Sequence, residues 1–235
     1  AAQAQTRCPS LSGRRLQVSQ ITSYGKVTAV TFDTSRAMVC YLNEATDLNA
    51  GLSGNGVCYG LTKTSTGISM GKVGALLTTA ANVTRAAGEL AAVNAGINRA
   101  VVCYNALTRT TVFPTAVTKL PIVCVAMLYS GGEVSVTGSV VTLFGHGGRF
   151  ISMSSLSATQ VIACFASTDH DAGPEVGFCK TLMFAGSGLV ASTVQAQFSS
   201  SATTSIVVQA FSDQHAVVCW MESVAVLPHG QCQVL

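Results

Sequence analysis

The chain has 235 residues, of which 49% are apolar and only 10% are charged, and its formal net charge is +3. An ordinary globular domain carries roughly a quarter charged residues, so this composition predicts a surface of mostly small, neutral side chains. The basic residues are spread thinly, with Arg14 and Arg15 as the densest pair, which argues against nucleic acid as a partner, and the longest apolar run, 120–129, has the length of a buried strand and not of a membrane span.

Taken in chain order, four segments align without gaps on a cysteine, and each has the pattern of a strand. Two apolar residues precede the cysteine each time, and an aromatic residue follows it. The four pairs of cysteine and aromatic residue are Cys40-Tyr41, Cys103-Tyr104, Cys164-Phe165 and Cys219-Trp220. A second cysteine follows each pair, at Cys58, Cys124, Cys179 and Cys232. The first cysteines are 55–63 residues apart, a period that suits four strands with their turns.

This period divides the chain into a partial unit at 1–21, three whole units at 22–80, 81–145 and 146–200, and a partial unit at 201–235. In the third whole unit we expect strands at 149–157, 160–167, 175–184 and 189–198, because β-branched and aromatic stretches are separated there by turn residues at 169–174 and 186–188. The Ala-rich segment 83–95 has helical propensity, but we predict a strand, because it occupies the place of 27–33 and 204–210 in the neighbouring units.

A four-stranded sheet of this size cannot bury both of its faces, so each unit is expected to form one small sheet that stacks on the next. Radial stacking of such sheets gives a β-propeller. The segment from Leu156 to Phe165, with Leu-Ser-x-Thr followed by Val and an aromatic residue, resembles the repeats of a β-propeller family, and this resemblance implies a fold but no activity. The predicted fold class is therefore all-β: a β-propeller-like array of about four four-stranded antiparallel blades, with 1–235 as a single repeat domain.

Closure of the ring is left open by the phase of the two ends. The chain begins near a third strand at Cys8 and ends in another third strand at Cys232. The N-terminal strands would supply the fourth strand that the last unit lacks, or the chain is a segment of a longer array, or a partner completes it.

The nine cysteines are expected to form one disulfide in each unit. The pairs Cys40–Cys58, Cys103–Cys124, Cys164–Cys179 and Cys219–Cys232 have separations suited to facing positions on adjacent antiparallel strands, where side chains lie roughly 4.5 to 5.5 Å apart. Disulfides imply an oxidising compartment, secreted, extracellular or lumenal. The alternative is free cysteine buried as a small hydrophobe, which would be compatible with the cytosol. Metal binding is disfavoured, because Cys-x-x-Cys is absent and the histidines are scattered. Cys8 has no partner within its own unit and is expected to be unpaired.

Candidate ligand sites are weak. Asp169, His170 and Asp171 could bind a metal ion or act as acid and base, but they lie in a predicted turn, where Asp is favoured for local backbone hydrogen bonds, and the turn is the preferred interpretation. The position four residues before the first cysteine is polar in every unit and could form a ring that binds sugar or anion, or simply a row of solvated strand ends. These four residues are Arg36, Arg99, Gln160 and His215. The segment Gly145-His146-Gly147-Gly148 is expected to be a hairpin turn between two strands.

Neither a catalytic nor a cofactor-binding motif is recognisable in the sequence. We therefore expect a non-catalytic β-propeller that acts as a structural or protein-interaction module, as a subunit of a larger assembly, without a cofactor. The alternative is a lectin-like propeller that binds carbohydrate, against which the single tryptophan, Trp220, counts. A hydrolase with its site in the blade loops is a third, weaker hypothesis.

Overall fold

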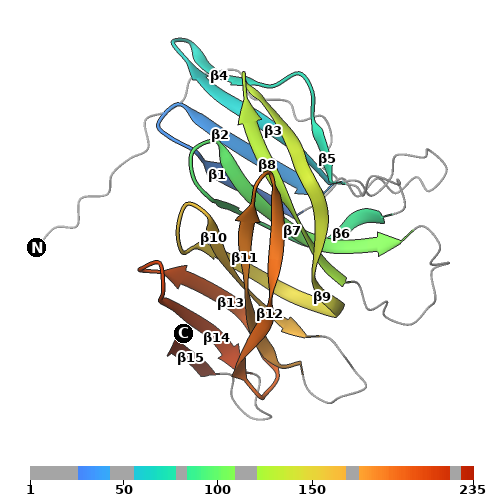
Figure 1. Ribbon diagram of the computed structural model, residues 1–235, viewed down its shortest axis with the longest axis vertical. Helices are drawn as coiled ribbons and strands as arrows, with labels where there is room; N and C mark the ends of the chain where they lie inside the picture. Colours follow the sequence, from blue (N-terminus) through green and yellow to red (C-terminus); the bar gives the residue numbers. More distant parts are fainter. Residues whose placement is uncertain (1–25, 43–55, 78–83, 109–120, 168–174, 223–228) are drawn as a thin grey trace, which may run out of the picture.

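The computed structural model describes residues 26–42, 56–77, 84–108, 121–167, 175–222 and 229–235 (Figure 1). All of the regular secondary structure in these ranges is β-strand, and all of the strand pairings are antiparallel. The all-β, antiparallel part of the sequence prediction is thus confirmed. Within the described ranges, no helix is long and apolar enough to cross a membrane.

The strands form three sheets. The first sheet has the order β1-β2-β3-β4, and β5 also pairs with β3. It consists of β1 (Val27–Thr31), β2 (Arg36–Leu42), β3 (Gly56–Thr64), β4 (Gly67–Met70) and β5 (Ala75–Leu77). The second sheet runs in sequence order from β6 to β12. It consists of β6 (Thr84–Asn94), β7 (Arg99–Thr108), β8 (Pro121–Ser130), β9 (Glu133–Ser155), β10 (Gln160–Ser167), β11 (Gly177–Ala185) and β12 (Gly188–Ser199). The third sheet consists of β13 (Thr203–Ala210), β14 (Ala216–Glu222) and β15 (His229–Val234).

The long strand β9 corrects two predictions. Residues 145–148 were expected to form a hairpin turn, but they lie inside β9, where Gly147 pairs with Pro121 of β8 and Gly148 pairs with Ser167 of β10. The glycines allow a close approach, because a Cβ at Gly148 would overlap the side chain of Ile122. The chain therefore passes from one strand partner to the next without turning, and the two middle units share one sheet instead of forming two.

The strands fall into four groups, which we number along the chain. Group 1 is β1–β5, group 2 is β6–β8 with the first part of β9, group 3 is the second part of β9 with β10–β12, and group 4 is β13–β15. Groups 1 and 4 lie at opposite ends of the molecule's long axis (Figure 1). Group 4 has three described strands, whereas β3, β8 and β11 each pair with a following strand.

Three apolar cores lie between successive groups. The core between groups 1 and 2 contains Met38 and Met127, and the core between groups 2 and 3 contains Ile122 and Phe165. The core between groups 3 and 4 contains Trp220, whose ring centroid lies 4.9 Å from that of Phe198. Each group thus buries apolar side chains against its neighbours, which is the stacking that narrow sheets require.

Candidate functional site

Four disulfides join the second and third strands of the four groups. The pairs are Cys40–Cys58, Cys103–Cys124, Cys164–Cys179 and Cys219–Cys232, the same pairs that the spacing predicts. Each pair occupies directly opposed positions in the strand register, with Cα atoms 4.0–4.1 Å apart. Disulfides of this kind are consistent with an oxidising compartment. Cys8 lies outside the described residues.

The cysteine and the aromatic residue that follows it point to opposite faces of their strand, because successive side chains alternate in a β-strand. In group 2, Cys103 lies in the core shared with group 3, whereas Tyr104 lies in the core shared with group 1. Cys164 lies toward group 4, whereas Phe165 lies toward group 2. In groups 2 and 3, the Cys-aromatic motif therefore contacts both neighbouring groups. Its alternation was visible in the sequence, but which face meets which neighbour was not.

The same rule leaves two sheet faces, one at each end of the stack, that no other described strand covers. In group 4, Trp220 is buried against group 3, so the Cys219–Cys232 disulfide points away from the other groups. In group 1, Cys40 is buried against group 2, so Tyr41 points away. We call these surfaces the Cys end face, on β13–β15, and the Tyr end face, on β1–β5.

Both end faces are rich in apolar side chains. The strand register places the following residues on the Cys end face: Val207, Val217, Cys219, Met221, Cys232 and Val234. It places the following residues on the Tyr end face: Val27, Val39, Tyr41, Tyr59, Leu61, Ile68, Met70 and Leu76. Val207 and Val234 are 61% and 60% exposed, and Val27 and Ile68 are 54% and 56% exposed. Contiguous apolar surface of this kind marks sites of interaction in soluble proteins.

The Tyr end face also carries a pair of aromatic rings. Tyr41 and Tyr59 are stacked with their ring centroids 6.2 Å apart. Partial burial raises the pKa of Tyr41, and the neighbouring Tyr59 raises it further through its charge and a hydrogen bond. The Tyr41 phenol is therefore not poised as an acid or base near neutral pH, and the stacked pair offers a flat aromatic surface instead.

The polar residues predicted to form a ring lie next to the hairpins between the first and second strands: Arg36, Arg99 and Gln160 are the first residues of β2, β7 and β10, and His215 directly precedes β14. Arg36 pairs with Asp33, donates a hydrogen bond to Asn98 in the hairpin of group 2, and lies over the ring of Tyr129 at 5.8 Å. Because of the Arg36 side chain first, and the backbone and hydroxyl of Ser35 next, the pKa of Asp33 lies well below its usual range. The Asp33 carboxylate therefore stays ionised, accepts hydrogen bonds from Ser35 and Arg36 within the hairpin, and cannot act as a proton donor.

The other members of this set are also occupied locally. Arg99 lies over the ring of Phe184 at 5.5 Å. The Nδ1 atom of His215 is 3.0 Å from the Ser212 hydroxyl, and its ring is stacked on Phe211. The backbone carbonyl of Gln160 accepts the Leu156 N–H at 2.9 Å. Arg36, beside the first hairpin, contacts Asn98 in the second hairpin. The contacts of the four residues do not bring them together at one centre.

Asp169, His170 and Asp171 fall in 168–174, outside the described residues. Within the described ranges, no group of three or more His, Cys, Asp or Glu side chains could hold a metal ion. Open grooves among the described residues include ones of about 530, 420 and 490 Å³. The first lies between two hairpins of group 1 and contains Asp33 and Lys63, the second lies between groups 3 and 4, and the third is bordered by Glu133. Their linings are not equivalent, and none places two free carboxylates or a nucleophile with a base.

A comparison of the sequence with protein-family models and with curated proteins finds no match. The candidate functional site therefore rests on geometry: within the described part of the chain, the two end faces are apolar sheet surfaces that no other described sheet covers.

Proposed function

We propose that this protein is a non-catalytic structural or protein-interaction module, built as a β-propeller-like array of blades that each contain one disulfide, and acting in an oxidising compartment. The observation that supports this best is the pair of apolar end faces. On the inner groups, the corresponding apolar residues are buried or partly buried against a neighbouring group, so the end faces are surfaces of a kind that elsewhere in this molecule is covered by another sheet.

The propeller part of the proposal is supported by how the groups stack. Propeller blades are narrow antiparallel sheets that pack face to face and expose only short edges. The groups share this packing and the spacing of the sequence repeat, and group 4 is one strand short of the others among the described strands. A missing strand in one blade is the position at which a propeller ring is completed by another segment.

The experiment that tests the proposed function is purification of the protein from its native source without reductant, followed by native mass spectrometry. A stoichiometric complex, with other chains or with further copies, supports an interaction module. A lone monomer under native conditions contradicts it. The non-equivalent grooves argue against one sugar pocket per blade, but reproducible binding on a glycan array would favour the lectin-like alternative over this proposal.

A further inference from the structure

The three internal interfaces share one arrangement. The disulfide of each group lies against the group that follows, and the aromatic residue after the first cysteine lies against the group that precedes. In these interfaces Tyr104, Phe165 and Trp220 are at most 5% exposed, and the cysteines of the first three disulfides are at most 2% exposed. Each interface therefore has a cysteine side and an aromatic side.

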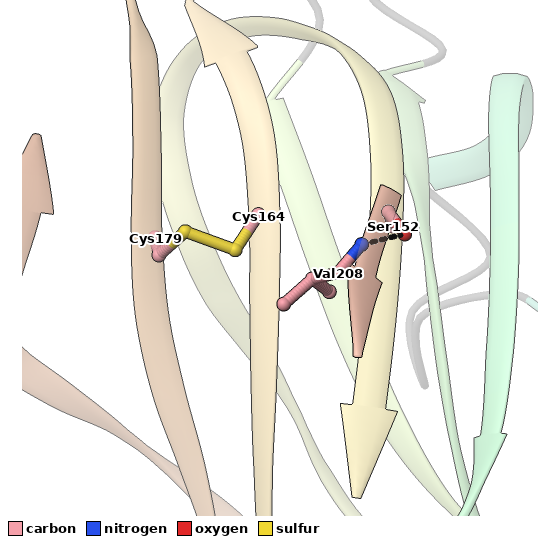
Figure 2. Close-up of a disulfide and its surroundings, with 4 residues drawn as sticks. All are labelled: Ser152, Cys164, Cys179 and Val208. Atoms are coloured by element: carbon pink, nitrogen blue, oxygen red, sulfur yellow. Dashed lines mark hydrogen bonds between the residues drawn. A yellow bond between two sulfur atoms is a disulfide. The ribbon is translucent and has the colours of Figure 1, made fainter. Parts of the chain in front are cut away.

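The interface between groups 3 and 4 shows how the two sides meet. Val208 of β13 points toward the Cys164–Cys179 disulfide, and its N–H donates a hydrogen bond of 3.0 Å to the hydroxyl of Ser152 on β9 (Figure 2). Two residues further along β13, the N–H of Ala210 donates a hydrogen bond of 2.9 Å to the hydroxyl of Ser154 on β9. The first strand of the following group thus covers the disulfide of the preceding group.

The two end faces are the two halves of one more interface of this kind. The Cys end face carries a disulfide over which no described strand lies, and Cys232 is exposed where its counterparts are buried. The Tyr end face carries Tyr41 in place of the buried aromatic residues, beside β1, the first strand of its group. The register places no charged residue on the Cys end face and only Lys63 on the Tyr end face, so no repulsion between charges opposes contact between them.

We propose that the Cys end face of one copy stacks on the Tyr end face of a second copy, head to tail, so that β1 of the second copy covers the Cys219–Cys232 disulfide of the first. This inference rests on the proposed function and names its partner. Within one chain the faces lie at opposite ends (Figure 1), whereas a second copy presents the missing half of the interface. A contact between two different faces is heterologous and generates either closed rings or open arrays.

Three single variants test this arrangement. Val207→Glu alters the Cys end face, Val27→Glu alters the Tyr end face, and Val194→Glu is the control, because Val194 is 74% exposed on β12, away from both faces. All three positions are exposed, so folding should be retained, and circular dichroism together with four intact disulfides checks this. A charge buried without a partner in an interface should weaken association by about tenfold or more.

Sedimentation velocity on the full chain over a wide concentration range is the measurement. The wild type and Val194→Glu should associate with rising concentration, each end-face variant should remain monomeric, and an equimolar mixture of the two end-face variants should form dimers that grow no further, because each contributes one intact face. A second readout is the rate at which a phosphine reduces Cys219–Cys232, which should fall as the wild type associates and should stay constant in Val27→Glu.

Three results would overturn the inference. These are a wild type that stays monomeric at every concentration, an end-face variant that still dimerises with itself, and a mixture that stays monomeric. A monomeric wild type whose native complex contains other chains would refute the self-stacking and leave the proposed function standing. A monomer both in solution and in the native source would refute both.

Discussion

The free energy of unfolding should fall further when a buried disulfide is removed than when the exposed one is removed, and the difference should come from packing alone. The double variant Cys164→Ala/Cys179→Ala opens a loop with a sequence separation of 15, and Cys219→Ala/Cys232→Ala opens one of 13. Constraint of the unfolded chain contributes about 3 kcal/mol in either case, because the contribution depends only weakly on loop length. The first pair, however, lies buried between groups 3 and 4, whereas Cys232 is exposed.

Loss of the buried sulfur atoms should therefore add about 1 to 2 kcal/mol in the first variant. We expect the free energy of unfolding to fall by about 4 to 5 kcal/mol for the buried pair and by about 3 kcal/mol for the exposed pair. Urea unfolding followed by the fluorescence of Trp220, the single tryptophan, measures both, with Cys8→Ser in every sample to prevent thiol exchange. Equal losses in the two variants, or a larger loss for the exposed pair, would refute the assignment of buried and exposed faces.

Three further predictions concern the described cores. Burial raises the pKa of Tyr104 from 10.0 to about 12, so the folded state keeps a proton that the unfolded chain loses; urea unfolding should show up to about 3 kcal/mol of stability lost as the pH rises from about 10 to about 12. Tyr104→Phe should remove the larger part of that slope, to which Tyr41, whose pKa is also raised, contributes the rest. Gly60→Ala should destabilise the protein by about 2 kcal/mol, because its Cβ would overlap a backbone carbonyl of group 2, whereas Gly145→Ala, with open space around it, should be close to neutral in thermal unfolding. Ser152→Ala should cost about 1 kcal/mol and speed hydrogen exchange at the amide of Val208; unchanged exchange would contradict the contact.

Much of the fold could be predicted from local pattern. The cysteine spacings predict the four disulfides because residues at facing positions of an antiparallel pair are close neighbours whatever surrounds the sheet. The Ala-rich segment 83–95 is the strand β6, since its place in the period outweighs its helical propensity. Strand β10 has the predicted bounds, 160–167, because β-branched and aromatic residues end at clear turn residues there.

The glycine segment of β9 could not be predicted in the same way. Glycine is compatible both with a turn and with a close approach of two strands, and the choice depends on the side chain of Ile122 from another strand. The end faces could not be predicted from the sequence either. Alternation predicts that Cys219 and Trp220 face opposite sides, but the side that meets group 3 is decided by how the connection after β12 places β13, which no local pattern encodes.

The first three disulfides each face the group that follows, and the last one, Cys219–Cys232, faces outward. Stepwise reduction of the folded protein at low concentration, with alkylation of the released thiols and peptide mass spectrometry, tests this most directly. Cys219 and Cys232 should be labelled first, and the three buried pairs should resist until the protein unfolds, with the connectivity given above. A different connectivity, or reduction of Cys164–Cys179 at the same rate as Cys219–Cys232, would contradict the account.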